Sequence, residues 1–434
     1  MMIPIFQITG DPSRYYQNDF IIEGEKYRSY LCSDAVREHL EKQGEDVKLV
    51  IFVPESFLTD ITLQEFCDLL EERVTDFEPA VLPAIGTFRN WKFEGNVEGV
   101  ITSIFLYILN QKPDKFYIDI STGFNLYPVS LLEAAKRYLT YRKLENILQE
   151  EYKVKAFKIF SPIIGEGSHV VEIQDLDVKA FFSLPNADVD TLVKRDKSSE
   201  KVSLRIGEIN KEYNLVKSRF RSLYKELTMA FNAIRFNTPL AFFDLIEMSA
   251  EVDEIERGVS EFVKTLLEPV ENTVKKRARL PVDGVNVANA FYSLALYRSI
   301  QKFAKNLGDP EIDEIYENFR KVYSKKNLGI GVNEYFLGRD VEDIKMTVSR
   351  ALKNRKISEE EEKLYANLYS HQKCEVRIDE NRSYGSSNIK RNFFAHSGFL
   401  REYTLIKFVG GKIYVQWLED AKKEIKRWLE SPEK

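Results

Sequence analysis

The chain has 434 residues, more than one typical domain, and its length favours two domains of roughly 200 residues each. Hydrophobic residues make up 44% and charged residues 30% of the chain, as is typical of a soluble globular protein. A net charge of −5 excludes a general electrostatic attraction to nucleic acid. Any RNA partner must therefore bind at a local basic site.

Cysteine spacing and hydropathy indicate the cellular compartment and whether the chain binds metal or a membrane. Cys32, Cys67 and Cys374 are scattered without C-x-x-C spacing, which predicts neither a disulfide nor a zinc site and fits a reducing compartment. The N-terminal residues lack the pattern of a signal peptide, and the longest apolar run, residues 100–109, is shorter than the roughly 20 residues that span a bilayer. We therefore predict a cytoplasmic protein with no membrane contact and no metal.

Strands and helices alternate through the first 190 residues. The pattern predicts a buried strand at 3–9, a β-hairpin at 20–28, a helix from Ser33 or Asp34 to Leu40, and a strand at 47–53. It then predicts a helix at 58–74, a proline-rich loop at Pro79 and Pro83, a helix at 96–109, a strand at 115–120, a helix from Pro128 to about 148, and strands at 155–160 and 169–173. Such alternation indicates a parallel sheet in an α/β Rossmann-like domain.

Two polar loops follow strands of this predicted sheet, and loops at the carboxyl ends of parallel strands form the ligand crevice of open α/β folds. The residues we assign to the crevice are Gly10, Asp11, Ser13, Arg14, Ser121, Thr122, Gly123 and Asn125. Their backbone amides and hydroxyls suit phosphates and purine edges. The chain has no G-x-G-x-x-G or Walker loop, so a nicotinamide or nucleoside triphosphate cofactor is not expected. Taken singly, each loop also reads as ordinary turn chemistry.

Together the loops resemble the CRISPR-associated Rossmann fold, CARF. The family has a first-strand loop of Gly-Asp/Asn-Pro-Ser type and a later strand ending in Asp-x-Thr-His-Gly-x-Asn. Here Gly10-Asp11-Pro12-Ser13 and the segment 119–125 recur in that order, with Ser121-Thr122 in place of Thr-His. The resemblance implies a crevice, doubled across a dimer axis, that binds a cyclic oligoadenylate made by a type III CRISPR complex. Cyclic tetra-adenylate is favoured, and the missing His leaves ring size and self-cleavage of the ligand open.

The polar stretch 190–203 marks the predicted domain boundary, which divides the chain into residues 1–190 and 191–434. Beyond it, amphipathic helices are predicted at 207–236, 240–276, 285–307, 311–326, 341–353 and 359–372, followed by a hairpin at 402–417 and a last helix to Leu429. Basic clusters at 275–279 and 353–356 are expected at helix ends, where they either contact RNA or complement the helix dipole. The second half is therefore predicted to be mainly α.

A short helix near the C-terminus carries the strongest functional signal. Ser386, Ser387 or Asn388 can cap its start, and Gly398 is placed to end it in a left-handed conformation. Phe393, Phe394, Phe399 and Leu400 are its predicted core anchors.

Arg391 and His396 flank one surface of this helix, about 140° apart around its axis. Two facing copies of the helix would bring two cations and two imidazoles to one phosphate. That set can support attack of an RNA 2′-hydroxyl on its own phosphodiester without metal. The spacing alone favours a different interpretation, a helix with an exposed Arg and a hydrogen-bonded core His.

The residues around this pair resemble the signature of the HEPN ribonucleases, in which the Arg is followed by a polar residue. Asn392 fits that position, and Ala395 and Gly398 suit close helix packing. The resemblance implies that Arg391 and His396 are catalytic, that Asn392 supports them, and that the active site is composite across a homodimer or a higher homo-oligomer.

Both resemblances together predict a cyclic-oligoadenylate-activated endoribonuclease of type III CRISPR defence. It would cut single-stranded RNA to 2′,3′-cyclic phosphate and 5′-hydroxyl ends. The alternative is a ligand-responsive transcription regulator in which His396 does no chemistry. Against this alternative, no compact recognition-helix pattern is present.

Overall fold

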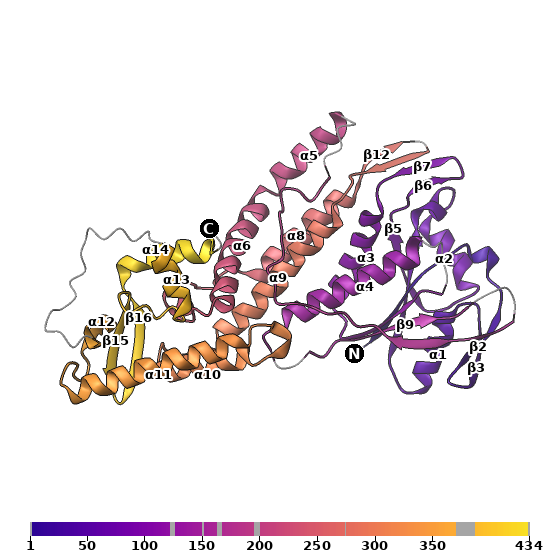
Figure 1. Ribbon diagram of the computed structural model, residues 1–434. Coiled ribbons are helices and arrows are strands. Elements are labelled where there is room, and N and C mark those ends of the chain that lie inside the picture. The colour runs from indigo at the N-terminus through magenta and orange to yellow at the C-terminus, as the bar shows by residue number, and fades with distance from the viewer. Residues whose placement is uncertain are drawn as a thin grey trace.

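The structure is a computed structural model that describes residues 2–121, 126–149, 152–162, 167–194, 200–273, 275–369 and 387–432. Figure 1 shows an elongated molecule with an α/β domain at one end and a group of helices and a hairpin at the other. Long helices join the two ends. Within the described residues, no helix combines the length and the apolarity needed to cross a bilayer.

A six-stranded sheet, in the order β11-β9-β8-β1-β4-β5, forms the centre of the N-terminal domain. Its strands are β1 (Ile3–Ile8), β4 (Val47–Pro54), β5 (Phe77–Leu82), β8 (Lys115–Asp119), β9 (Lys155–Phe160) and β11 (Glu172–Asp175). Neighbouring strands pair in parallel except β11, which is antiparallel to β9. Every residue of β1 is buried, as expected for a strand covered on both faces. The predicted parallel α/β sheet is confirmed.

Helices cover both faces of this sheet. On one face, α3 (Val97–Gln111) and α4 (Leu126–Glu145) share a core with Phe6, Phe52 and Phe116. On the other, α1 (Cys32–Lys42) and α2 (Leu63–Glu71) pack on Ile5 and Ile51. The short 3-10 helices η1 (Pro12–Arg14) and η2 (Glu55–Leu58) follow β1 and β4. This is a doubly wound Rossmann-like arrangement.

Three local predictions in this domain are wrong. Helix α1 begins at Cys32 with no side-chain cap, and Ser33 inside it donates to Gln7 instead. Helix α2 begins only at Leu63, because Thr62 and Glu65 form a reciprocal capping box there. The expected loop around Pro79 is strand β5, and the sheet tolerates this proline because β5 is an edge strand.

Two smaller sheets complete the α/β end. The predicted hairpin is confirmed as β2 (Asn18–Ile22) and β3 (Glu25–Ser29), and β10 (Ser168–Val170) pairs with β2. The strand predicted at 169–173 is therefore split between β10 and β11. The other sheet joins β6 (Gly86–Phe88) and β7 (Trp91–Glu94) to β12 (Pro269–Thr273) and β13 (Lys276–Arg279). Strands from both halves of the sequence thus share one sheet.

The basic cluster at 275–279 is in this sheet and not at a helix end, which corrects the prediction. Arg279 donates two hydrogen bonds of 2.6 Å to the buried Glu55 carboxylate, and Arg277 also contacts Glu55. These pairings tie β13 to η2. The guanidinium of Arg279 therefore has a structural partner within the chain.

Five helices connect the two ends: α5 (Glu200–Glu212), α6 (Asn214–Arg235), α7 (Ala241–Asp244), α8 (Val252–Leu267) and α9 (Gly284–Ala304). The helix predicted at 207–236 is two helices, and the one at 240–276 is broken into α7, α8 and the β12–β13 strands. Helix α9 packs on α3, where Phe105 and Phe291 lie 5.5 Å apart between ring centroids. The core is therefore continuous from the sheet into these helices.

The C-terminal region is mainly helical and ends in a β-hairpin and a helix. Its elements are α10 (Ile312–Tyr323), η3 (Lys326–Leu328), α11 (Val332–Lys353), β14 (Glu362–Leu364), α12 (Tyr365–Tyr369), α13 (Ser387–Ala395), β15 (Thr404–Val409), β16 (Lys412–Trp417) and α14 (Glu419–Glu430). The hairpin and the last helix are confirmed. Helix α11 begins well before the predicted residue 341, and β14 with α12 replaces the described part of the helix predicted at 359–372.

Candidate active site

Helix α13 presents the predicted Arg and His and ends where the sequence indicated. The amide of His396 donates to the Asn392 carbonyl at 3.0 Å, and that of Gly398 donates to the Phe393 carbonyl at 2.9 Å. Ser397 and Gly398 both have positive φ, 52° and 77°, so the chain reverses directly after His396. The predicted left-handed stop is confirmed. Of the candidate caps, Ser386 lies outside the described residues.

Aromatic packing fixes this turn to the hairpin and the last helix. Phe393 is fully buried, with its ring centroid 5.5 Å from that of Trp417 and 5.3 Å from that of Trp428. The Trp417 indole N–H donates to the Gly398 carbonyl at 2.9 Å. Phe399 and Leu400 are buried and Phe394 is half-buried, as predicted. The backbone that carries His396 is thus held by two elements, β16 and α14.

All three residues assigned to catalysis are exposed on this anchored helix. Asn392 and His396 line a pocket of about 240 Å³, whereas Arg391 does not line it. The other lining residues are Asp340, Asp343, Ile344, Tyr365, Phe399, Leu400, Arg401 and Glu402. The His396 side chain is 54% exposed, so the alternative prediction of a hydrogen-bonded core His is wrong.

Two residues of α11 that no sequence motif predicted also contact the end of α13 and His396. Asp340 is buried, and one of its carboxylate oxygens lies 3.7 Å from His396 Nδ1. Arg339 contacts the same oxygen at 3.0 Å and donates to the Ala395 carbonyl at 3.4 Å. A signal was present, because Asp340 interrupts the apolar stripe that Leu337, Val341 and Ile344 form on the helix.

The predicted ligand crevice lies at the carboxyl ends of β1 and β8, which are adjacent strands. Strand order reverses between them, and this is the switch point where open α/β sheets bind ligands. Gly10, Asp11, Ser13 and Arg14 follow β1, and Ser121 follows β8, so these five residues lie at the same edge of the sheet. Thr122, Gly123 and Asn125 lie outside the described residues.

Hydrogen bonds within the first loop fix its shape. The Asp11 carboxylate caps η1 by accepting from the Ser13 amide at 3.1 Å and from its hydroxyl at 2.7 Å. Tyr15, whose pKa is raised by burial, accepts from the Gly10 amide at 2.6 Å. Arg14 is 84% exposed and lies 3.7 Å from Asp11. Ser13 and Arg14 therefore place a hydroxyl and an exposed cation after β1, where the ligand site is predicted.

A buried carboxyl ends strand β8 at this edge of the sheet. Asp119, the last residue of β8, is fully buried and accepts from the Ser121 amide at 2.8 Å. Burial raises its pKa to about 6, although the bonds from Ser121 and the Ser33 backbone oppose the shift. Among the described residues its second oxygen has no hydrogen-bond partner. This end of β8 therefore carries a carboxyl that burial makes harder to ionise.

Comparison with known families assigns both regions. Residues 5–162 match the family model for the CARF domain of the CRISPR system endoribonuclease Csx1, and residues 331–419 match the model for its HEPN domain. The chain belongs to the CARF–HEPN ribonucleases of CRISPR systems. A search among curated proteins gave no match.

Both candidate sites fall inside these matches. The crevice loops belong to the CARF segment, and Arg391, Asn392 and His396 belong to the HEPN segment. The protein is thus a CRISPR-associated, ligand-responsive nuclease, and its HEPN domain makes it an endoribonuclease. This assignment favours the enzyme over the transcription regulator.

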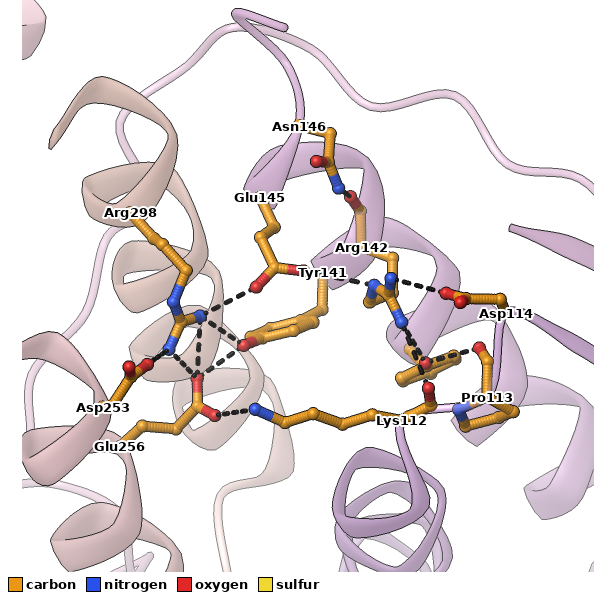
Figure 2. Close-up of polar contacts among 11 residues, drawn as sticks. Lys112, Pro113, Asp114, Tyr141, Arg142, Glu145, Asn146, Asp253, Glu256 and Arg298 are labelled. Carbon is orange, nitrogen blue, oxygen red and sulfur yellow. Dashed lines mark hydrogen bonds and ion pairs between the residues drawn. The ribbon is translucent and has the colours of Figure 1, made fainter. Parts of the chain in front are cut away.

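A buried charge cluster joins the CARF helices to the helices that lead to HEPN (Figure 2). Arg298 of α9 donates to the Tyr141 hydroxyl at 2.6 Å, to Glu145 at 3.1 Å and to Glu256 of α8 at 3.2 Å. The Tyr141 hydroxyl in turn donates to Glu256. Helix α4, which carries Tyr141 and Glu145, starts directly after the second crevice loop. The cluster therefore connects that loop's helix to α8 and α9.

Proposed function

We propose that this CARF–HEPN protein is a metal-independent endoribonuclease of the cytoplasm that a cyclic oligoadenylate activates and that cuts single-stranded RNA. The observation that carries the proposal is the placement of His396. It is exposed on an anchored helix turn beside Asn392, over a pocket in the HEPN segment, and Arg391 is exposed on the same helix.

The chemistry follows from these side chains. The RNA 2′-hydroxyl attacks the adjacent phosphorus, and the bond from phosphorus to the 5′-oxygen breaks. His396 gives its proton to the departing 5′-oxygen, and the second imidazole of a dimer accepts the proton of the 2′-hydroxyl. Arg391 neutralises the phosphate, and Asn392 hydrogen-bonds near it. The products are a 2′,3′-cyclic phosphate and a 5′-hydroxyl.

A homodimer places two such helices together. Its support is an exposed apolar group at the start of α11: Val332 is 61% exposed, Tyr335 69% and Phe336 37%. Arg339, which contacts the end of α13, lies one turn further along the same helix. Burial of these aromatic side chains against a second copy would stabilise the dimer beside the active site. The composite site would then take its Arg391 and His396 residues from both copies.

The activator binds, in this proposal, in the CARF crevice. Ser13 and Ser121 supply hydroxyls and Arg14 a cation for its phosphates, together with the backbone of Gly10, Asp11, Thr122, Gly123 and Asn125. We favour cyclic tetra-adenylate. Residues 1–190 would form the sensing part and residues 191–434 the cutting part.

Activation requires that the ligand prefer one arrangement of the two HEPN helices over another. A route for this preference runs through α4, whose 20 residues span about 30 Å from the crevice loop to the Arg298 cluster. Beyond the cluster, α9 continues toward α10, and Lys325 near η3 donates to the Gln149 carbonyl at 2.6 Å. Movement of α4 would therefore act on both connections.

The test is cleavage of labelled single-stranded RNA in EDTA, with cyclic tetra-adenylate, cyclic hexa-adenylate or no ligand. We expect one cyclic oligoadenylate to stimulate cutting, and His396→Ala and Arg391→Ala to abolish it. Asn392→Ala should lower the rate. Lys390→Ala is the matched control, because it removes a neighbouring cation that bonds only the Ser431 carbonyl among the described residues. An undiminished His396→Ala enzyme, or equal cutting without ligand, would remove the proposal.

A further inference from the structure

Asp340 is a charged side chain buried directly behind His396. The residue is 7% exposed, and one carboxylate oxygen, Oδ1, lies 3.7 Å from His396 Nδ1. That distance is too long for a hydrogen bond but short enough for an ion pair, and contacts of this kind often tighten when substrate binds. A buried carboxylate against an exposed imidazole is the arrangement that orients catalytic histidines.

A chain of hydrogen bonds fixes the orientation of this carboxylate. Ser397 donates its hydroxyl proton to Asp340 Oδ2 at 2.7 Å. The side-chain amide of the buried Asn237 donates to the Ser397 hydroxyl at 2.8 Å and contacts the Asn333 carbonyl at 3.3 Å. The end of α6, helix α11 and the turn after α13 are thereby tied together. Asp340 therefore cannot turn away from His396 without breaking these bonds.

Arg339 completes the group from the solvent side. Its guanidinium bonds Asp340 Oδ1 at 3.0 Å and 3.3 Å, and it also reaches the Ala395 carbonyl at the end of α13. Asp340 Oδ1 is thus shared between a permanent cation and the imidazole. This sharing compensates the charge of the buried carboxylate.

We propose that Asp340 is a positioning residue for His396. The inference rests on the proposed function. The carboxylate holds the proton on Nδ1 of the imidazole, which leaves Nε2, on the far side of the ring, to exchange the proton with the RNA. It also stabilises the imidazolium that donates to the 5′-oxygen. Without it, Arg339 would face the imidazolium uncompensated and disfavour it.

Charged and titratable groups from three parts of the chain surround His396. Asp340 and Asp343 of α11, Tyr365 of α12, and Arg401 and Glu402 of the turn before β15 line its pocket, and Arg339 of α11 pairs with Asp340. Among these, Asp343 is engaged elsewhere, because it accepts from the Tyr365 hydroxyl at 3.1 Å and pairs with Arg401 at 3.6 Å. Glu342, the neighbouring carboxylate on α11, provides a matched control: its side chain is 66% exposed, it lies 3.5 Å from Lys345, and it does not line this pocket.

The experiment compares Asp340→Asn and Glu342→Gln with wild type and His396→Ala in ligand-activated RNA cleavage across pH. We expect Asp340→Asn to lower kcat about 10- to 100-fold with the KM for RNA unchanged, the size typical of a lost orienting partner. The alkaline limb of its pH–rate profile should move to lower pH. Glu342→Gln should keep the wild-type profile. Ser397→Ala, which frees the carboxylate but leaves its charge, should lower kcat a few-fold.

The outcomes separate this inference from the function on which it rests. A fully active His396→Ala enzyme overturns the proposed function itself. An inactive His396→Ala enzyme beside Asp340→Asn and Ser397→Ala enzymes with wild-type kcat and pH profile overturns only the role of Asp340. Melting temperature and cyclic-oligoadenylate binding are measured for each variant, and Ser397→Ala decides the question if Asp340→Asn does not fold.

Discussion

Replacing Arg298 by methionine removes the centre of the charge cluster between the CARF helices and α8 and α9. The Arg298 side chain is 9% exposed, and that of its partner Glu256 is 8% exposed. Methionine fills much of the same volume, so the main effect is electrostatic. Glu256 would then be a buried carboxylate without its guanidinium partner.

The expected loss is about 3 kcal/mol of unfolding free energy. Breaking a buried ion pair from one side typically costs about 3–5 kcal/mol. We place Arg298→Met at the lower end because Glu256 keeps two partners, the Tyr141 hydroxyl and Lys112 at 3.3 Å. Asp253 contributes little, since its side chain is 81% exposed and water replaces the contact.

Urea denaturation, followed by far-UV circular dichroism, measures the loss. Lys112→Met is the control. Its side chain is 54% exposed, and its loss should cost about 1 kcal/mol or less. In the Glu256→Gln background, Arg298→Met should cost about 2 kcal/mol less than in wild type, because the charge left behind is gone. A wild-type midpoint for Arg298→Met, or strict additivity in this cycle, would refute the account of the cluster.

Two further predictions concern Asp119 and Gly398. Burial raises the pKa of Asp119 from 3.8 to about 6, so this carboxyl favours the folded state fully below pH 3.8 and the benefit is lost as pH rises through 6. The unfolding free energy changes by about 3 kcal/mol between these two limits. In urea titrations, Asp119→Asn should flatten the decline of the unfolding free energy over this pH interval. An unchanged slope would contradict the raised pKa of Asp119. Gly398→Ala places a Cβ on a residue with φ 77°, 3.4 Å from both Thr238 and Trp417. The substitution should lower the unfolding free energy by about 1–2 kcal/mol and reduce RNA cleavage. An unchanged melting temperature and unchanged cleavage would contradict the strained turn.

The sequence predicts the alternation of strands and helices well where a strand is buried on both faces. Strand β1 is apolar nearly throughout and is buried on both faces, so its pattern has one reading. Pro79 misled the prediction, because a proline is compatible with a strand only at a sheet edge, and the edge is a property of the whole sheet. The basic residues of β13 misled it similarly, since their partner strand β7 lies far away in the sequence.

In the candidate site, too, the residues of a local motif were predictable and the contact between distant segments was not. Arg391, Asn392 and His396 form a local motif within six consecutive residues at the end of α13, and Gly398 marks its end, so the sequence alone pointed to all four. Asp340 contributes through space from α11, and no short-range spacing connects it to His396. Only the folded arrangement reveals the contact.

The most direct measurement of the central claim uses two versions of one labelled oligonucleotide, all-RNA and RNA with a single 2′-deoxynucleotide at the principal cleavage site. Initial rates are measured in EDTA with and without cyclic tetra-adenylate. The account predicts ligand-dependent cutting of the RNA to 2′,3′-cyclic phosphate and 5′-hydroxyl ends, and no cutting at the deoxy position. Cutting at the deoxy position, or equal rates with and without any cyclic oligoadenylate, would contradict it.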